Sequence, residues 1–182
     1  FKVFGFSDKT ITDLGGIDTI DFTGLYSSTL VDEGVTLDLS IVDGTRQEVR
    51  SDGSIAITGA IENAYGSSLD DKFTGNTYEN VLYGGGGNDT LQSGGGNGSS
   101  LGGGSGNDLI YGGPTGTSTL SGGTGNDSIR GSGGNDLIFG GEDNDTIEAS
   151  SGHESVEGGD GNDLIFGSTG GRDTLSGGTG ND

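Results

Sequence analysis

The 182-residue sequence predicts an all-β fold: a right-handed parallel β-roll (β-helix) with 18-residue coils, preceded by a short β-strand-rich N-terminal cap. A nine-residue repeat runs from Gly66 to the last residue, one position of the repeat is apolar in every unit, and another is aspartate in every second unit. Glycine fills 43 positions and proline only one, so turns that need glycine are frequent. We therefore expect a cap or linker region over 1–65 and a repeat roll over 66–182, truncated at its C-terminal end.

The first 65 residues differ in kind from the rest. Glycine is less frequent there, and β-branched residues are more frequent. Short alternating stretches predict β-strands at 10–12, 19–22, 35–39 and 55–57. The region is therefore expected to form strands that lead into the repeats.

Each nonapeptide is expected to form a glycine-rich turn of six residues followed by a strand of three. Position eight, the middle of the strand, is apolar in every unit and should point inward. These residues are Phe73, Leu82, Leu91, Leu101, Ile110, Leu120, Ile129, Ile138, Ile147, Val156, Ile165 and Leu175. Two units then make one coil with two facing parallel sheets.

Positions seven and nine of each unit should point outward. This arrangement leaves several large apolar side chains on the outer faces, which we regard as a candidate partner surface. They are Leu109, Tyr111, Leu137, Phe139, Leu164 and Phe166.

Position six distinguishes the two edges of the roll, because alternate units lie on the same edge. One edge carries aspartate throughout: Asp71, Asp89, Asp108, Asp127, Asp145, Asp163 and Asp182. The other edge is mixed: Asn80, Ser99, Ser118, Asp136, Glu154 and Asp173. Stacked carboxylates repel each other unless a cation lies between them. We therefore predict one complete ladder of metal sites and one partial ladder, best formed at Asp136, Glu154 and Asp173.

The donor set and its spacing favour calcium. Adjacent strands lie about 4.8 Å apart and calcium–oxygen bonds are about 2.4 Å long, so an ion midway between two coils can reach a carboxylate from each. Glycine lets backbone carbonyls supply further oxygen ligands. Zinc prefers His or Cys, of which the chain has one and none, and magnesium requires shorter, more regular bonds. Because each nonapeptide supplies one core residue, we expect the repeats to be disordered without calcium.

Composition excludes several function classes. Seven Lys and Arg against 28 Asp and Glu give a net charge of −21, which argues against nucleic acid or an anionic membrane as a partner. No apolar run is long enough for a membrane span, and residues 1–20 lack the features of a signal peptide. Without cysteine there are no disulfides or cysteine nucleophiles. The missing initiator Met and the interrupted last repeat predict a piece of a longer protein.

No catalytic constellation is predicted. His153, the only histidine, is expected to be an exposed loop residue. Residues 98–102 match the G-x-S-x-G pattern of serine hydrolases but lie in a Gly/Ser-rich turn, without the strand-to-helix setting that the nucleophile needs. The chain is therefore expected not to be an enzyme.

The repeat has the form Gly-Gly-x-Gly-x-Asp-x-U-x, where U is a large apolar residue, as in GGGGNDTLQ (84–92), GGSGNDLIY (103–111) and GGDGNDLIF (158–166). It resembles the repeats of the RTX calcium-binding β-roll family. Together with DLGGIDTID (13–21) and IENA (61–64), it makes the whole chain similar to the C-terminal domain of serralysin-type secreted metalloproteases. The three-histidine zinc motif of those proteases is absent, because the chain has a single histidine.

This resemblance implies a set of calcium ligands. Before the later repeats they are Asp13, Gly15, Gly16, Asp18, Ala60 (through its carbonyl), Glu62, Ser67, Leu69, Asp71, Asn76, Tyr78 and Asn80. In the later units they are the glycines at positions one, two and four: Gly84, Gly85, Gly87, Gly103, Gly104, Gly106, Gly122, Gly123, Gly125, Gly140, Gly141, Gly158, Gly159 and Gly161. Asp143 replaces one position-four glycine, so its loop geometry is expected to differ slightly. The position-six carboxylates complete the set: Asp89, Asp108, Asp127, Asp145, Asp163, Asp182, Asp136, Glu154 and Asp173.

The resemblance also implies a function. In that family such modules stay unfolded at low calcium inside the cell, pass through a type I secretion channel, and fold outside, where they stabilise the attached protein. The expected partners are therefore calcium ions and the upstream or downstream domains of a parent chain, such as a secreted hydrolase. The alternative is a structural module of a cell-surface layer protein or adhesin, which self-assembles at the surface or spaces other domains.

Overall fold

The computed structural model describes residues 9–13, 15–24, 33–50, 53–168 and 170–182. Over these residues the fold consists of strands and turns without a helix, which confirms the all-β prediction. Accordingly, this part of the chain contains no helix that is long and apolar enough to cross a membrane.

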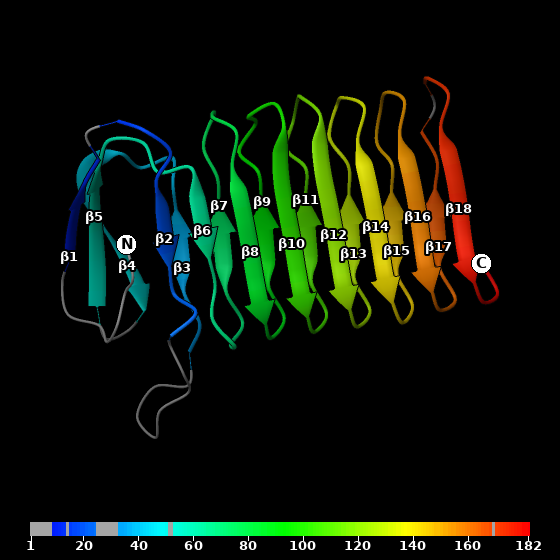
Figure 1. Cartoon of the computed structure of the whole chain (residues 1–182), viewed down its shortest axis with the longest axis horizontal. Helices are drawn as coiled ribbons and strands as arrows, with labels where there is room; N and C mark the ends of the chain where they lie inside the picture. The colour runs from blue at the N-terminus through cyan, green and yellow to red at the C-terminus, as the bar shows by residue number, and fades with distance from the viewer. Residues whose placement is uncertain (1–8, 14, 25–32, 51–52, 169) are drawn as a thin grey trace.

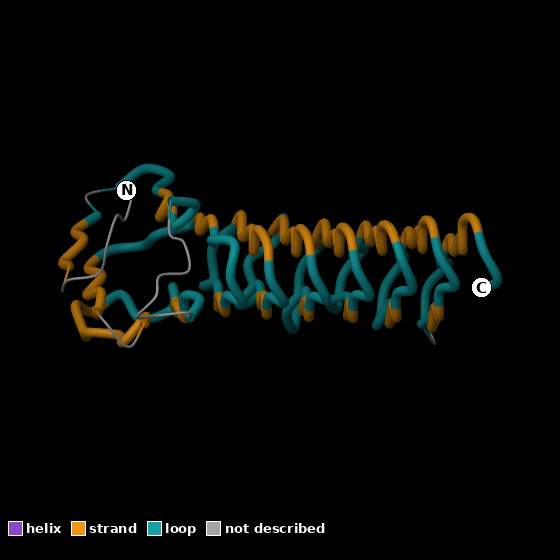
Figure 2. The backbone as a smooth tube through the Cα atoms, turned by 90° about the horizontal axis from the view of Figure 1, so that it is seen from below, coloured by secondary structure: helices purple, strands orange, loops and turns teal. Residues whose placement is uncertain are grey.

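Two long parallel sheets face each other along the molecule (Figures 1 and 2). The long-strand sheet contains, in spatial order, β18 (Thr174–Thr179), β16 (Ser155–Asp160), β14 (Leu137–Glu142), β12 (Ser118–Thr124), β10 (Ser99–Ser105), β8 (Val81–Gly86), β6 (Asn63–Tyr65) and β2 (Thr19–Asp21). The short-strand sheet contains β17 (Leu164–Phe166), β15 (Thr146–Glu148), β13 (Ser128–Arg130), β11 (Leu109–Tyr111), β9 (Thr90–Gln92), β7 (Lys72–Thr74) and β3 (Thr36–Asp38). Successive nonapeptides alternate between the two sheets, so two units make one coil, as predicted.

The register of the sheets follows the repeat. Leu101 pairs with Leu82 on one side and with Leu120 on the other, so position-eight residues stack coil upon coil. The repeat strands of the short-strand sheet have three residues, as predicted. Those of the long-strand sheet are longer than predicted, because pairing continues through the following glycines, as between Gly85 and Gly104.

The core of the roll consists of two facing rows of position-eight side chains, one row from each sheet. All of them from Phe73 to Val156 are buried, and Ile165 is partly buried against the same cluster. Leu175, on the outermost strand β18, is 45% exposed. The predicted inward orientation is therefore confirmed along the roll, and burial declines only at its last coil.

The N-terminal region contributes to two structures. The predicted strands at 10–12 and 55–57 correspond to β1 (Lys9–Thr12) and β5 (Gly53–Thr58), which form a cap sheet with β4 (Asp43–Arg50) in the order β1-β5-β4. The mostly polar β4 was not predicted. The predicted strands at 19–22 and 35–39 correspond to β2 and β3, which begin the two long sheets. The sheets of the roll therefore start well before Gly66.

The outward positions are exposed to different degrees. Leu137, Leu164 and Phe166 are exposed, whereas Leu109, Tyr111 and Phe139 are half-buried. The apolar pair on β14 does not adjoin the pair Val81 and Tyr83 on β8, because β10 and β12 lie between them. The outer apolar residues therefore form separate groups rather than one continuous stripe.

Candidate metal centres at the two edges of the roll

The position-six side chains lie in the turns that join the two long sheets. Turns from the long-strand sheet to the short-strand sheet carry the aspartate ladder, and we call this side the aspartate edge. Turns in the opposite direction carry the mixed set from Asn80 to Asp173, and we call this side the mixed edge. The structure thus places alternate units on the same edge, as the spacing predicted.

Each carboxylate of the aspartate edge reaches back to the preceding coil. The Oδ1 atom of one aspartate accepts a hydrogen bond from the backbone N–H of the aspartate one coil earlier. The N···O distances are 2.7 Å from Asp71 to Asp89 and from Asp89 to Asp108, 2.8 Å from Asp108 to Asp127 and from Asp127 to Asp145, 2.9 Å from Asp145 to Asp163, and 3.1 Å from Asp163 to Asp182. This ladder fixes one oxygen of every carboxylate.

The second oxygen of these carboxylates is buried without a partner. The atoms concerned are Oδ2 of Asp89, Asp108, Asp127, Asp145 and Asp163. A buried carboxylate oxygen that accepts no hydrogen bond is costly, so each one calls for a positive ligand. In each case the oxygen lies over the position-one glycine of its own turn, in space that a Cβ atom would fill. These glycines are Gly84, Gly103, Gly122, Gly140 and Gly158.

Backbone carbonyls point into the gaps between the coils. A Cβ atom on Gly104 would overlap the carbonyl oxygen of Gly85, and one on Gly123 would overlap that of Gly104. Both glycines have positive φ, of 119° and 125°. Position four repeats the pattern, since a Cβ on Gly125 would overlap the carbonyl oxygen of Gly106. Only glycine fits here, and its carbonyls face the next coil.

From Gly84 onward, Asp143 is the one non-glycine residue at position four of the units on this edge. It adopts a positive φ of 75°, and its carbonyl oxygen lies where a Cβ on Gly161 would be. The residue therefore follows the backbone path of the glycines that it replaces, with the strain that a side chain adds in this conformation.

The donor set fits calcium better than a transition metal. Among the described residues, no group of three or more His, Cys, Asp or Glu side chains gathers to hold a metal. A cation between two coils would instead be held by one or two carboxylates together with carbonyls from positions two and four. An all-oxygen, partly backbone site is what calcium accepts and zinc does not.

Burial strongly perturbs these carboxylates. Burial raises the pKa of Asp89 to about 8, with the neighbouring charges of Asp108 and Asp71 adding to the rise. Burial likewise raises the pKa of Asp127 to about 7 and that of Asp145 to about 6. Near neutral pH the aspartate edge must therefore take up protons or another positive charge.

In the first half of the mixed edge, the position-six side chains are hydrogen-bond donors instead of unpartnered carboxylates. The amide nitrogen of Asn80 donates to the carbonyl of Glu62 at 2.8 Å, and the hydroxyl of Ser99 donates to the carbonyl of Gly96 at 3.3 Å. The hydroxyl of Ser118 donates to the carbonyl of Gly112 at 3.2 Å. Side-chain donors therefore satisfy carbonyls in these turns.

The second half of the mixed edge returns to carboxylates. Asp136 accepts a hydrogen bond from the backbone N–H of Ser132. Both carboxylate oxygens of Glu154 are buried without a partner, and burial, together with a hydrogen bond to Asp173, raises the pKa of Glu154 to about 7. Among the described residues of this edge, Glu154 most resembles the aspartates of the other edge.

The ligands predicted before the repeats lie close together. The backbone N–H of Gly15 donates to Asp13 at 2.7 Å, and that of Asp18 donates to Glu62 at 2.9 Å. A hydrogen bond to Asp13 raises the pKa of Asp18, and the charges of Asp13 and Glu62 add to it. Ala60 lies in the turn after β5. Asp13, Asp18 and Glu62 are therefore neighbours next to β2 and β6, but they do not form a group of three that could hold a metal by itself.

The first units of the repeat region are more fully hydrogen-bonded. Asp71 accepts from the backbone N–H of Ser67 at 2.6 Å, and Asn80 accepts from that of Asn76 at 2.9 Å. The predicted carbonyl ligands Leu69 and Tyr78 lie in the same two turns. In these turns, side-chain and backbone donors occupy the carboxylate and amide oxygens that a cation would otherwise contact.

An asparagine ladder beside the aspartates was not predicted. The Oδ1 atom of each position-five side chain accepts the backbone N–H of the next coil, at N···O distances between 2.6 and 3.1 Å. Its members are Asp70, Asn88, Asn107, Asn126, Asn144, Asn162 and Asn181. The signal was present in the sequence, because asparagine precedes aspartate in nearly every complete unit.

The two residues that the sequence analysis considered for catalysis, Ser100 and His153, take part in strand pairing and in a backbone hydrogen bond. Ser100, in the G-x-S-x-G stretch, lies on β10 and pairs with β8 and β12. The Nδ1 atom of His153 accepts a hydrogen bond from the backbone N–H of Arg172 at 2.9 Å. Neither residue is placed with a base or nucleophile partner in the described part of the chain.

Comparison with known families agrees with this geometry. Four copies of the RTX calcium-binding nonapeptide repeat match residues 65–99, 101–114, 115–147 and 148–182. A search of curated proteins finds no match. The matched residues make up more than half of the chain and contain both edges described above.

Proposed function

Because the chain belongs to the family of RTX calcium-binding nonapeptide repeats, we propose that it is a calcium-dependent folding module of a larger secreted protein. The observation that carries the proposal is the row of buried, unpartnered Oδ2 atoms from Asp89 to Asp163. Such a row is unfavourable without a cation and is stabilised by one in each gap.

The predicted ligands act in repeated units. In each gap of the aspartate edge, the ion would be held by carboxylates from position six and carbonyls from positions two and four, such as those of Gly104, Gly106 and Asp108. When bound, calcium supplies positive charge that neutralises the carboxylates. Because calcium binds only the folded form, its binding raises the free energy of unfolding by mass action. Glu154 with Asp173, and Asp18 with Asp13 and Glu62, are proposed as further sites.

This coupling suits a protein that works outside the cell. At low calcium the carboxylate repulsion and the small core keep the chain unfolded, a state compatible with passage through a type I secretion channel. Extracellular calcium then drives folding, and the folded roll stabilises the parent chain. The family is a non-catalytic repeat, so the activity of that parent would belong to other segments.

A calcium titration tests the proposal directly. The chain, freed of calcium by a chelator, is titrated with calcium while far-UV circular dichroism is recorded, with magnesium as the control. We expect a cooperative transition from disorder to β-structure that only calcium produces. A β-rich spectrum that is unchanged by chelation would overturn calcium-dependent folding.

The parent's role is tested separately. Attachment of the roll to its native neighbouring domain should raise that domain's melting temperature in calcium but not in chelator. Calcium-dependent lattices in the electron microscope, with no such stabilisation, would instead support the alternative role in a surface layer or adhesin.

A further inference from the structure

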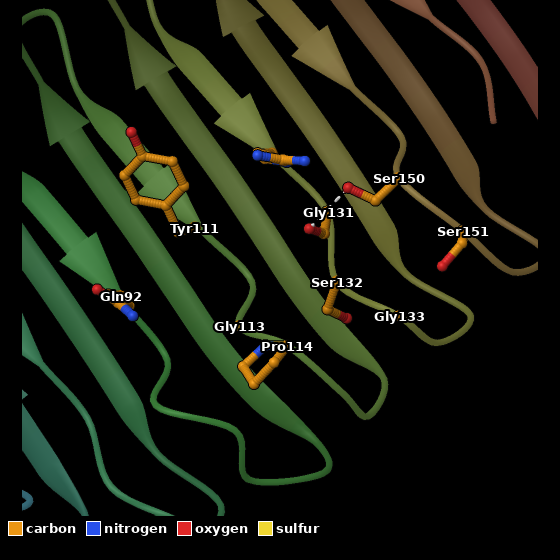
Figure 3. Close-up of a pocket in the computed structure, with 10 residues that line it drawn as sticks. Gln92, Tyr111, Gly113, Pro114, Gly131, Ser132, Gly133, Ser150 and Ser151 are labelled. Atoms are coloured by element: carbon orange, nitrogen blue, oxygen red, sulfur yellow. Dashed lines mark hydrogen bonds between the residues drawn. The ribbon is translucent and has the colours of Figure 1, made fainter.

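The mixed edge has turns of two lengths, and the change between them shapes the surface. Between position nine of one unit and position six of the next, the chain has six residues at 93–98 and 112–117 but five at 131–135 and 149–153. The step between the longer and the shorter turns borders a hollow of about 620 Å³ (Figure 3). This volume lies in the range of small-molecule sites, about 300–1,000 Å³.

The floor of the hollow is a row of position-nine side chains. Gln92, Tyr111 and Arg130 come from the adjacent strands β9, β11 and β13 and stand side by side in register. Within the described part of the chain, the amide of Gln92 and the hydroxyl of Tyr111 make no hydrogen bond to protein. The floor therefore offers an aromatic ring together with polar groups that are available to a ligand.

The walls are held in place by the protein itself. Pro114 stands on one side, and the turns that contain Ser132 and Ser150 stand on the other (Figure 3). The hydroxyl of Ser132 donates to the carbonyl of Gly116 at 2.6 Å, and that of Ser150 donates to the carbonyl of Gly131 at 3.0 Å. These contacts link neighbouring turns, so the hollow is formed before any ligand arrives.

The charge of the hollow is balanced. Arg130 and Arg172 are the only basic residues in 73–182 of a chain whose net charge is −21. The guanidinium of Arg130 lies 3.4 Å from the carboxylate of Glu148, which neutralises it. An anion would be repelled by the surrounding negative field, and the Arg130–Glu148 pair leaves no net charge in the hollow to attract a cation. A neutral ligand suits the site best.

We propose that this hollow binds a short neutral oligosaccharide. The Tyr111 ring presents a flat apolar face for the C–H groups of one sugar ring, while the Gln92 amide and free N–H groups of Arg130 reach its hydroxyls. The exposed hydroxyl of Ser151 contacts a second sugar at the rim. None of these side chains is a proposed calcium ligand, so the sugar site is separate from the calcium sites.

The test uses the full chain, ¹⁵N-labelled and saturated with calcium. It is titrated by NMR with maltotriose, cellotriose and chitotriose. At least one should produce saturable shifts of the Gly113, Gly131 and Gly133 amides, with a Kd of about 0.1–1 mM. Tyr111→Ala should weaken this binding at least tenfold, roughly the loss expected from removing an aromatic stacking partner. The matched control Tyr83→Ala, on the outer face of the long-strand sheet, should leave it unchanged.

A second variant guards against loss of folding. If Tyr111→Ala lowers the melting temperature, the variant Arg130→Met is used instead, because the Arg130 side chain is exposed. Arg130→Met should also weaken sugar binding. The proposal is overturned if none of the three sugars produces saturable shifts or if the shifts map away from the hollow. It is also overturned if Tyr83→Ala weakens binding equally, or if trigalacturonate binds more tightly than every neutral trisaccharide.

Discussion

The two edges of the roll are built from the same repeat but satisfy their buried oxygens in different ways. On the aspartate edge, Oδ2 of Asp89, Asp108 and Asp127 is buried without a donor. On the mixed edge, the hydroxyls of Ser99 and Ser118 donate to turn carbonyls that would otherwise be available to a cation. The aspartate edge thus requires a positive ligand, whereas in part of the mixed edge internal hydrogen bonds already satisfy the oxygens that a cation would contact.

The difference shows that a nonapeptide turn can form in two chemical states. A carboxylate at position six makes the turn dependent on an ion, because it adds buried negative charge and no donor. A hydroxyl or amide at the same position supplies the donor itself, at a gain of about 1 kcal/mol per hydrogen bond. Calcium dependence should therefore be concentrated on the aspartate edge.

The largest effect is expected from removing calcium. Under gradual chelation the amides of Asp108 and Asp127, which are bonded to neighbouring carboxylates, should lose protection from hydrogen exchange first. The amides of Gly98 and Gly112 on the mixed edge donate to backbone carbonyls and should lose protection later. Exchange resolved by residue with NMR measures this order. If the amides of the mixed edge exchanged earlier, calcium dependence would not be concentrated on the aspartate edge.

The next largest effect is expected from Asp127→Asn. Asparagine keeps the shape and an acceptor for the N–H of Asp108 but removes the charge that binds the ion. Fewer ions should bind in calorimetry, and each lost site should lower stability by about 2.7 kcal/mol when calcium is roughly 100-fold above its Kd.

Ser99→Ala is the matched control for that substitution. Ser99 is fully buried, donates to Gly96 and accepts from the N–H of Asn80, so its loss should cost about 1–2 kcal/mol. The number of bound ions should not change. If both variants lost the same number of bound calcium ions, calcium binding would not be concentrated on the aspartate edge.

A smaller effect is expected from pH in the absence of calcium. Burial raises the folded-state pKa of Asp89 to about 8 and that of Asp127 to about 7, above the ordinary value of 3.8. The folded state then binds more protons than the unfolded state at intermediate pH. The stabilising contribution is full below about pH 4 and is lost as the pH rises through 7–8.

Far-UV circular dichroism in chelator between pH 5 and pH 8 measures this effect. The calcium-free protein should contain the most β-structure at the acidic end, whereas in calcium the acid should weaken stability because protons compete for the carboxylates. An apo protein that becomes more stable as the pH rises would show that the aspartates are not buried as described.

The smallest effect is expected from converting one edge toward the other. Ser118→Asp places a carboxylate next to Asp136, whose Oδ1 already accepts the N–H of residue 118 at 2.7 Å. Calorimetry should detect about one additional calcium, with a modest change in stability, because the turn at 112–117 is one residue longer than the turn at 131–135 and fits the ion less well. No additional ion would mean that position six alone does not make a site.

Much of the fold was predictable because the repeat is local. The period of nine, the apolar position eight and the aspartate spacing of 18 or 19 residues gave the coil, the inward row and the edge to which each carboxylate belongs. The strand at 36–38 also follows simple alternation, whereas the strand at 63–65 was not predicted. Polar β4 was missed because antiparallel pairing with β5 rather than a side-chain pattern creates it. The long strands through Gly85 and Gly104 were missed because pairing between coils extends them.

What the sequence determined by itself is the chemistry available at each level of the roll: an all-β solenoid and carboxylates suited to calcium. Only the tertiary structure decided which oxygens are left without donors, as at Asp108, and which are closed, as around Ser118. It also decided that β2 and β3 begin the long sheets and that turns of unequal length leave a hollow at Tyr111. The physical reason is that a repeat fixes spacing along the chain, whereas hydrogen bonding and burial depend on contacts between coils.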